Sequence, residues 1–291
     1  MNYFLSNKLF SNKQFGFIKG RSCMLQLLNI LSDWSDTFDL GGQIDVIYTD
    51  FEKAFDKVPH CYLLNKLKCY GISKLLINWI ESFLFSRTQQ VHINGAFSSC
   101  RNVLSGIPQG TVLGPLLFII FINDLPEACQ SLAKLFLFAD DAKLYKSVTS
   151  LSDSLILNQC CQKIFDWSNN CGMMLNVEKC KFLHISKHKT PLVNSNYSFV
   201  LENGKTVLLE NVLKIKDLGV TIENDLTFDT HIYDKIKIAN KMLGIINRNF
   251  SNLDKVSFVL LYKSLVRSHL EYANSIWSPY KCLLIKDIEN V

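Results

Sequence analysis

Three aspartates in this sequence have the residue type and setting that divalent-metal chemistry requires. Asp50 follows the apolar run 44–48, and Asp140 and Asp141 lie between two further apolar runs. If those runs are neighbouring strands of one sheet, three negative charges meet at one edge and repel one another unless cations neutralise them. Mg²⁺ prefers one or two carboxylates with waters and phosphate oxygens, and two such ions clamp the reacting oxygens of an in-line phosphoryl transfer. Taken alone, Asp140-Asp141 is more commonly a polar β-turn.

Helices and strands that can hold these aspartates are predicted on both sides of them. Ser22 is a predicted N-cap for a helix that ends near Gly41-Gly42, and Gly71 suits the left-handed position after another helix. Asn94-Gly95 between alternating residues predicts a hairpin with a type I′ turn. In chain order, the predicted elements of this part are a strand at 44–48, helices at 60–70 and 73–85, the hairpin at 90–103, a loop at 105–110, an apolar helix at 115–125 and a second hairpin at 135–145.

The rest of the chain changes character near residue 228. An amphipathic helix is predicted over 150–170, and short strands within 181–221 include a tight turn at Asn203-Gly204. After Asp229 the pattern is helical and basic, with a break near Ser251. We therefore place a domain boundary near 228 and expect an α+β fold with a helical annex.

Composition limits the class of protein without naming a partner. The 291 residues are 48% hydrophobic and 20% charged, which is typical of a globular protein, and the net charge of +5 permits a polyanionic partner without requiring one. The ten cysteines form no C-x-x-C pair, and Cys161, Cys171, Cys180 and His184 are spaced too widely for a zinc module. With neither a signal-peptide pattern nor a long apolar run, we expect an intracellular, soluble protein with reduced thiols.

Several segments, in one order along nearly the whole chain, resemble an enzyme family. They are residues 14–22 (QFGFIKGRS), 50–58 (DFEKAFDKV), 105–110 (SGIPQG) with Leu113-Gly114-Pro115, 138–141 (FADD), 175–181 (LNVEKCK), 217–220 (DLGV), and 261–266 (LYKSLV) with Leu270-Glu271-Tyr272. Together they resemble the reverse transcriptases of non-LTR (LINE-type) retrotransposons, particularly the jockey-like groups. Each segment is weak evidence by itself, but the ordered set is specific.

The resemblance implies an α+β, right-hand polymerase fold with an antiparallel palm sheet. It assigns residues 1–43 to partial fingers, 44–228 to a palm with an inserted fingers segment at about 60–104, and 229–291 to a truncated, thumb-like helical region. An Arg-Pro-Ile-Ser motif that the family usually carries before residue 14 is absent from the sequence. We therefore expect a fragment of a longer element-encoded protein.

The family's metal ligands map onto the three aspartates of the opening pattern. Asp50, Asp140 and Asp141 are the implied ligands of two Mg²⁺ (or Mn²⁺) ions, with the backbone carbonyl of Phe51 as a further ligand. Two other acidic residues lie close by in sequence, but they do not match a metal-binding position. We expect Glu52 and Asp56 to be structural or solvated.

Nucleotide selection is the role that the resemblance gives to Phe55, Gln109 and Gly110. An aromatic ring at Phe55 would lie beneath the sugar of the incoming nucleotide and collide with a 2′-hydroxyl, so deoxynucleotides are favoured. Gln109 and Gly110 would pack against the nucleotide and template base, since glycine lets the backbone approach a ligand closely. The structural alternatives are a core phenylalanine and an ordinary strand-to-helix turn.

Three basic residues have roles implied by the same resemblance. Lys179 matches a lysine that acts as general acid toward the departing pyrophosphate, and a solvated surface lysine is the alternative. Lys19 and Arg21 are expected to contact template or triphosphate, and a solvated basic turn is their alternative. The basic helices after residue 230 would grip a primer–template backbone through sequence-independent phosphate contacts.

The sequence thus predicts an RNA-directed DNA polymerase that adds deoxynucleotides to a primer 3′-hydroxyl. Its expected partners are an RNA template, a DNA primer and deoxynucleoside triphosphates, with no membrane. The main alternative is a catalytically silent, truncated remnant that at most binds nucleic acid. An RNA-templated RNA polymerase is disfavoured by Phe55, and a helical scaffold without a polyanion partner is permitted by the modest net charge.

Overall fold

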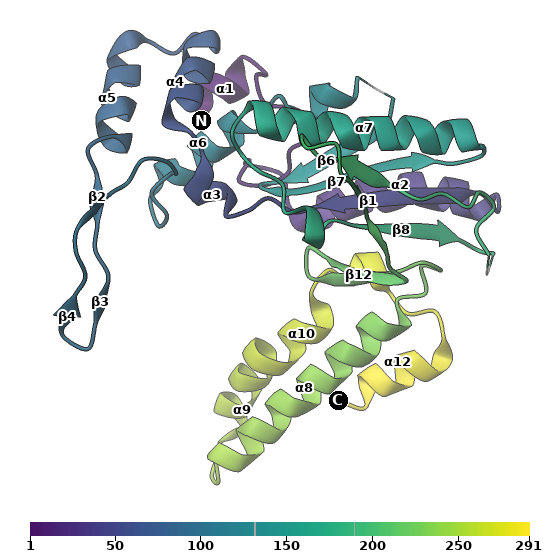
Figure 1. Cartoon of the computed structure of the whole chain (residues 1–291). Helices are drawn as coiled ribbons and strands as arrows, with labels where there is room; N and C mark the ends of the chain where they lie inside the picture. The colour runs from purple at the N-terminus through teal and green to yellow at the C-terminus, as the bar shows by residue number, and fades with distance from the viewer. Residues whose placement is uncertain (131, 189) are drawn as a thin grey trace.

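A five-stranded sheet forms the centre of the molecule (Figure 1). The computed structural model describes residues 1–130, 132–188 and 190–291. The strands lie in the order β11-β8-β1-β7-β6, and every pair is antiparallel except β11 with β8. Their bounds are β1 Gln43–Thr49, β6 Lys134–Phe138, β7 Asp141–Ser147, β8 Lys181–Ser186 and β11 Glu210–Asn211. Because β1 is the middle strand, it pairs with β7 on one side and with β8 on the other.

Helices and small two-stranded sheets account for the remaining regular structure. The helices are α1 Asn2–Ser6, α2 Cys23–Asp39, α3 Ala54–Lys57, α4 His60–Cys69, α5 Lys74–Leu84, α6 Leu113–Phe121, α7 Leu151–Asn170, α8 Asp229–Asn249, α9 Lys255–Leu261, α10 Ser268–Glu271, α11 Asn274–Trp277 and α12 Cys282–Glu289, with 3₁₀ turns at Leu125–Cys129 and Val177–Lys179 and a π-helix at Tyr262–Arg267. The paired strands are β2 Thr88–Gln89 with β5 Arg101–Asn102, β3 His92–Ile93 with β4 Ala96–Phe97, β9 Ser198–Val200 with β10 Thr206–Leu208, and β12 Lys214–Asp217 with β13 Val220–Glu223.

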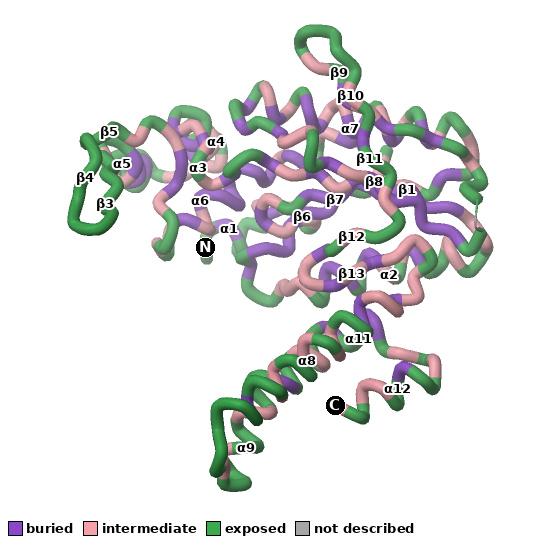
Figure 2. Tube along the Cα trace, turned by 60° about the horizontal axis from the view of Figure 1, so that its bottom comes forward, coloured by how far each residue is buried: buried purple, intermediate pink, exposed green. Residues whose placement is uncertain are grey.

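Side-chain alternation along β7 separates two apolar cores, one on each face of the sheet. Ala142 and Leu144 belong to a core that includes α6 and α7, whereas Tyr145 belongs to a second core with Trp34 of α2 and the C-terminal Trp277. The burial colouring in Figure 2 shows the central strands as the most buried part of the chain. The sheet is therefore covered on both faces, and only its edges and strand ends meet solvent.

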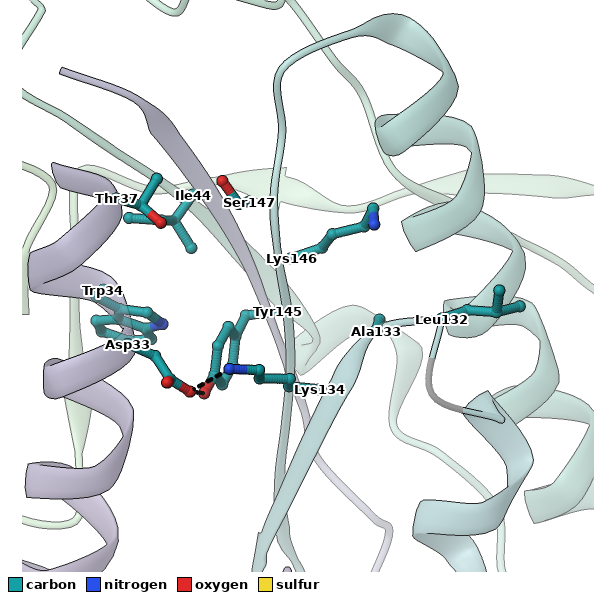
Figure 3. Close-up of a pocket in the computed structure, with 10 residues that line it drawn as sticks. All are labelled: Asp33, Trp34, Thr37, Ile44, Leu132, Ala133, Lys134, Tyr145, Lys146 and Ser147. Carbon is teal, nitrogen blue, oxygen red and sulfur yellow. Dashed lines mark hydrogen bonds and ion pairs between the residues drawn. The ribbon is translucent and has the colours of Figure 1, made fainter. Parts of the chain in front are cut away.

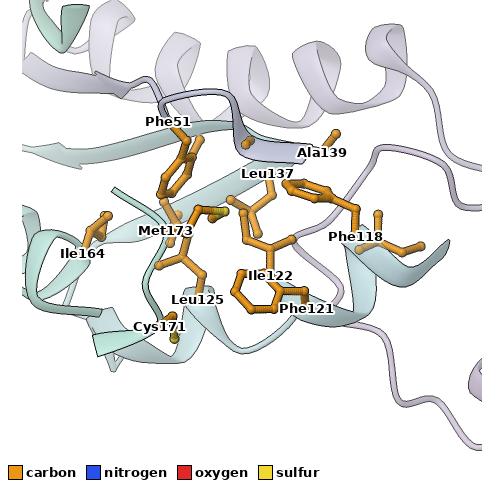
Figure 4. Packing of buried hydrophobic residues seen from close by; sticks show 14 of the residues in the cluster. Phe51, Phe118, Phe121, Ile122, Leu125, Leu137, Ala139, Ile164, Cys171 and Met173 are labelled. Atoms are coloured by element: carbon orange, nitrogen blue, oxygen red, sulfur yellow. The ribbon is translucent and has the colours of Figure 1, made fainter. Parts of the chain in front are cut away.

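The first core packs closest beneath the strand ends that carry the aspartates. Figure 4 shows Phe51, Phe118, Leu137 and Met173 meeting there from four different elements or loops. Phe118 and Leu137 have no exposed surface, and burying one such side chain contributes about 1.5–3 kcal/mol. The chain on either side of the aspartates is thereby fixed by apolar packing.

Polar contacts hold α2 against the face of the central sheet that carries the second core. Ser22 caps the helix by accepting a hydrogen bond from the Leu25 N–H, as the sequence predicts. Further along, Asp33 accepts hydrogen bonds from Lys134 of β6 and from the Tyr145 hydroxyl of β7, both at 2.7 Å (Figure 3). One carboxylate thus connects the helix to both strands of the β6–β7 hairpin.

Most local predictions are confirmed, with one helix misplaced. Asn94 and Gly95 both have positive φ, as a type I′ turn requires, and Gly71 has φ +76° after α4. The apolar helix predicted over 115–125 instead spans Leu113–Phe121. A 3₁₀ turn follows it, because Pro126 has no N–H to continue the α-helical pattern and the Asn123 side chain is bonded to Ser11 and Leu9.

The chain beyond residue 228 is helical, as predicted, and extends away from the sheet (Figure 1). α8 packs against the π-helix and α10 around a small core of Ala239, Ile246 and Val266. Many other side chains of these helices are exposed (Figure 2). Within the described residues, no helix has the length and apolar character needed to cross a bilayer.

Acid should weaken the contact between this helical region and the β12–β13 hairpin through His231. His231 is 1% exposed, accepts a hydrogen bond from the Thr221 N–H at 3.0 Å and packs against Trp277. Burial, aided by Lys235 and Lys216 and opposed by Asp234, lowers the pKa of His231 from 6.5 to about 4. Between pH 6.5 and about 4, His231 binds a proton in the unfolded chain but stays neutral in the folded chain. Stability contributed by neutral His231 is therefore present above pH 6.5 and lost as the pH falls toward 4.

We expect this one group to remove roughly 3 kcal/mol of the free energy of unfolding between pH 7 and pH 4. Denaturant unfolding of the wild type and of His231→Gln across that range measures the difference, because glutamine retains an acceptor but does not titrate. Parallel pH profiles for the two proteins would contradict the assignment.

Candidate active site

The register of β1 and β7 brings the three aspartates to one end of the sheet. Thr49 of β1 pairs with Ala142 of β7, so Asp50 and Asp141 are the next residues along two neighbouring strands. The β6–β7 hairpin closes at the pair Phe138–Asp141. Asp140 is therefore a turn residue, while Asp141, which the sequence placed in the turn, is the first residue of β7. The convergence that the sequence made conditional on strand pairing is present.

The β6–β7 turn has an unusual backbone, and a buried glutamine supports it. Ala139 has φ +55°, a left-handed conformation that costs a non-glycine residue about 1 kcal/mol or more. The Gln14 side chain is fully buried, and its Oε1 accepts hydrogen bonds from the Ala139 N–H at 2.9 Å and from the Gly16 N–H at 2.8 Å. A Cβ atom at Gly16 would lie 2.4 Å from the Ala139 nitrogen. The turn that presents Asp140 is thus braced by a segment 125 residues away in sequence.

Backbone pairing also fixes the peptide that follows Asp50. The Asn176 N–H donates to the Asp50 carbonyl at 2.7 Å, and the Glu52 N–H donates to the Met174 carbonyl at 3.0 Å. In such an antiparallel bridge, the backbone groups of Phe51 itself point away from the paired segment. The Phe51 carbonyl is consequently directed away from residues 174–176, while its ring is buried against Trp167.

Clustered negative charge, only partly offset by Lys179 and Lys143, is the main electrostatic property of this site. Burial by surrounding protein, and then Asp50, raises the pKa of Asp140. Burial, Asp140 and Asp217 raise the pKa of Asp141 to about 6, although Lys143 opposes the rise. Lys179 Nζ lies 3.6 Å from Asp50 Oδ2 and is well exposed. These carboxylates are held together at a cost that a bound cation would relieve.

A divalent ion fits this donor set as an open site. Among the described residues, no three His, Cys, Asp or Glu side chains form a ready-made cage for a metal ion. Carboxylates that leave coordination positions for water and phosphate oxygens are the arrangement that Mg²⁺ favours. Beside them lies a hollow of about 150 Å³, whose lining includes Asp50, Asp141, Lys179 and Asp217.

The residues expected to select the nucleotide, Phe55, Gln109 and Gly110, follow Asp50 in the chain. The Phe55 ring is half-buried, stacks on Phe118 with 4.2 Å between ring centroids and meets Phe17 edge-on. Gln109 is exposed and donates from Nε2 to Asp56 Oδ1 at 3.0 Å. Gly110 is exposed with φ +76°.

A second, larger cleft of about 880 Å³ lies beside Gln109, and Lys53, Asp56 and Arg87 also line it. Gly106 is also part of the lining, with φ +86°, and a Cβ atom there would lie 2.5 Å from the Asp56 carbonyl oxygen. The acidic neighbours of Asp50 have local partners: Asp56 accepts from Gln109, and Glu52 pairs with Lys57 at the surface.

Lys19 and Arg21 have different surroundings although they are close in sequence. Lys19 is exposed. The Arg21 guanidinium donates to the backbone carbonyls of Ser11 and Gln14 and lies over the Phe15 ring. Burial lowers the pKa of Arg21. Arg21 therefore helps to hold the segment that braces the Ala139 turn.

Two further features near the aspartates were not assigned a role from the sequence. One is the bracing of Ala139 by Gln14, and the other is a buried ion pair between Lys143 of β7 and Asp217 of β12. The sequence signals for the pair are a lysine between the apolar residues Ala142 and Leu144 and the presence of Asp217 in the segment 217–220, and neither identifies the other as its partner.

Comparison with known proteins identifies the family to which the chain belongs. Residues 1–222 match the sequence family described as reverse transcriptase (RNA-dependent DNA polymerase). The chain belongs to the reverse transcriptase family. It is 29% identical over 277 residues to the RNA-directed DNA polymerase from the mobile element jockey of Drosophila melanogaster, and 26% identical over 279 residues to the probable enzyme from the transposon X-element of the same fly. Each match covers 91% of this chain but 29% of the relative.

Solved structures support the same fold for this reverse transcriptase chain. Apo telomerase from Candida tropicalis superposes with a TM-score of 0.56 at 13% identity, covering 99% of this chain and 46% of that one. A form of the same telomerase without its C-terminal domain gives 0.54 at 14% identity, covering 78% of this chain and 42% of that one. The right-hand polymerase fold expected from the sequence is confirmed.

The brace on the β6–β7 turn predicts a stability effect. Gln14→Ala would leave the N–H groups of Ala139 and Gly16 buried without their acceptor, at about 1–3 kcal/mol for such groups. We expect a loss of that size in the free energy of unfolding, together with faster amide exchange at the turn.

Gln162→Ala is the matched control, because Gln162 makes similar side-chain bonds to the Val200 backbone at a solvent-accessible position. Its loss should stay below about 1 kcal/mol, since water can replace those bonds. Equal losses for the two variants would show that the brace is not specially important.

Proposed function

We propose that this chain is the catalytic region of an RNA-directed DNA polymerase encoded by a non-LTR, jockey-like retrotransposon. The observation that carries the proposal is the meeting of Asp50 with Asp140 and Asp141 on neighbouring strands of a reverse transcriptase fold. The reaction is attack of a primer 3′-hydroxyl on the α-phosphorus of a deoxynucleoside triphosphate, with pyrophosphate leaving. An RNA template directs the choice of nucleotide.

Two Mg²⁺ or Mn²⁺ ions would be held by Asp50, Asp140 and Asp141 and by the backbone carbonyl of Phe51. When bound, such ions stabilise charge on the attacking and leaving oxygens of the transfer. The raised pKa values of Asp140 and Asp141 support this proposal, because clustered carboxylates are stabilised as anions by a nearby cation. The direction of the Phe51 carbonyl, away from residues 174–176, is compatible with its proposed role.

The other proposed roles belong to residues at the rim of the site. Lys179, beside Asp50 and open to solvent, is suited to donate a proton to the departing pyrophosphate. Phe55 would support the sugar ring and exclude a 2′-hydroxyl, since its stacking on Phe118 holds the ring in one orientation. Gln109 and Gly110 would contact the nucleotide and the template base.

At the fingers end we assign Lys19 a template or triphosphate contact. Arg21 would contribute its remaining N–H groups to the same ligand while two backbone carbonyls orient its guanidinium. In this proposal residues 1–43 act as partial fingers, 44–228 as the palm with an inserted segment at about 60–104, and 229–291 as a thumb. The thumb's basic side chains would contact the phosphates of the primer–template duplex. They include Lys235, Lys237, Lys241, Arg248, Lys263 and Arg267.

Primer extension on poly(rA)·oligo(dT) with Mg²⁺ or Mn²⁺ tests the proposed activity. The wild-type chain should incorporate dTTP, and the double variant Asp140→Ala, Asp141→Ala should lose at least about 10³-fold in rate, because carboxylates that bind metal are removed. Equal signals from the two proteins would rule out the proposed site. Salt-dependent duplex binding by the wild type without extension would instead identify a silent remnant that binds nucleic acid.

Replacing Phe55 tests the basis of sugar selection. Phe55→Ala should raise incorporation of rTTP relative to dTTP by about 10-fold or more, because removing the ring makes room for a 2′-hydroxyl. The ratio of kcat/KM values for the two nucleotides is the measurement. Phe83→Ala, which removes another partly buried ring packed against the same core but on α5, is the control. An unchanged ratio in Phe55→Ala would reject the steric role.

A further inference from the structure

The β12–β13 hairpin lies against the central sheet as a separate two-stranded unit (Figure 1). At its open end, backbone hydrogen bonds join the flanking residues to β8: the Val212 N–H donates to the Phe182 carbonyl and the Ser186 N–H to the Asn224 carbonyl. Its inner side chains Val220 and Ile222 are buried in the second core. Its turn, Leu218-Gly219, lies at the opposite end, where the aspartates converge.

An ion pair attaches this turn end to the hairpin that carries the metal-binding carboxylates. Lys143 of β7 donates from Nζ to both carboxylate oxygens of Asp217, the last residue of β12. The two side chains are 1% and 3% exposed, so the pair is removed from water. Lys143 is two residues from Asp141 on the same strand, and alternate residues point to the same face. The pair therefore lies directly next to Asp141 on one side of the sheet.

The shape of the candidate active site depends on the same contact. The hollow beside the aspartates is lined on one side by Asp50 and Asp141, and on another by 215–218 of β12 and its turn. Lys143 and Asp217 both belong to this lining and connect the two sides. A shift of the β12–β13 turn relative to β7 would change the width of the hollow at the metal-binding carboxylates.

A second contact holds the turn from the helical region. The Tyr272 hydroxyl donates to the Leu218 carbonyl at 2.8 Å. Its ring lies so close to Gly219 that a Cβ atom there would be 2.9 Å from Tyr272 Cε1, and Gly219 has φ +85°. Two contacts thus fix the position of the turn: the ion pair of Lys143 with Asp217, which precedes the turn, and the hydrogen bond from Tyr272 to Leu218 within it.

Stability alone gives a weak reason for such a pair. A buried ion pair contributes little net stability relative to apolar residues of similar volume, since desolvation offsets the attraction, although removing one partner is strongly destabilising. The ion pair fixes the position of Asp217 relative to Lys143, because the lysine ammonium bonds to both carboxylate oxygens. An apolar contact would not restrict the two side chains in this way. Its placement two residues from Asp141 makes that geometry relevant to the site.

We propose that Lys143 and Asp217 are positioning residues for the metal-binding carboxylates. Their ion pair holds the β12–β13 turn against β7, which fixes the orientation of Asp141 and the width of the hollow beside it. This inference rests on the proposed polymerase function for its catalytic consequence. The positional consequence, a fixed β6–β7 turn, can be measured independently of catalysis.

The test replaces the whole pair with apolar residues of similar volume, Lys143→Met with Asp217→Leu, in the 291-residue chain. We expect a Tm close to that of the wild type. Amide exchange of the peptide spanning 138–142 should be faster, and Mn²⁺ titration followed by electron paramagnetic resonance should show weaker binding. Primer extension should lose about 10- to 100-fold in kcat, because small displacements of catalytic groups have effects of that size, while the KM for dTTP changes little.

Two further variants separate position from general stability. Lys143→Arg keeps the charge and donors, so it should recover part of the lost kcat. Asp45→Asn alters another fully buried carboxylate, which is bonded to His184, Ser195 and Tyr197 near the far end of β1. Measured below its Tm, that variant should extend primers at nearly the wild-type rate despite lower stability.

The outcomes distinguish this inference from the proposed function. If the apolar double variant matches the wild type in amide exchange, Mn²⁺ affinity and kcat, the pair is merely structural and the proposal is wrong. If the wild type itself fails to extend primers, the proposed function fails, yet faster exchange at 138–142 in the double variant would still support the positioning role. Unchanged exchange would refute that role whatever the activity.

Discussion

Mutual repulsion among carboxylates at the end of a buried sheet is the interaction around which this molecule is organised. Asp50 and Asp141 come from the neighbouring strands β1 and β7, and Asp140 comes from the β6–β7 turn, so the register of β1, β6 and β7 fixes their separation. Like charges would move apart if the backbone allowed it. The chain prevents this with apolar packing beneath the strand ends, a glutamine bonded to the β6–β7 turn and a peptide bridge behind Asp50.

The supports come from distant parts of the sequence, and each acts on a different carboxylate. Gln14 acts on the turn that contains Asp140, residues 174–176 act on the peptide after Asp50, and Lys143 with Asp217 acts next to Asp141. The three aspartates are therefore supported by segments from the N-terminal, middle and later parts of this chain. The helical region also takes part, since Tyr272 bonds to the turn that follows Asp217.

Local signals in the sequence predicted much of the fold and picked out the three aspartates that the strand register brings to one end of the sheet. Ser22, Gly71 and Asn94-Gly95 specify a cap, a helix end and a turn from a few adjacent residues, so the short-range chemistry is sufficient. Lys143 and Asp217 are 74 residues apart, and Gln14 and Ala139 are 125 apart. A single sequence does not reveal such pairs, because a lysine in a strand or a glutamine in a loop is compatible with many partners. The end of the helix Leu113–Phe121 was misplaced for a related reason, since Asn123 is committed to contacts with residues 9 and 11.

The left-handed backbone at Ala139 has a consequence for how decayed copies of such a gene are read. The letters of the Phe-Ala-Asp-Asp motif survive any mutation elsewhere, but the shape of the turn depends on Gln14 and on the absence of a side chain at Gly16. A copy that has lost either residue still displays an intact motif to a sequence search, although a support of the turn that carries Asp140 is gone. The motif alone therefore does not report the geometry of the turn, which also depends on Gln14 and Gly16.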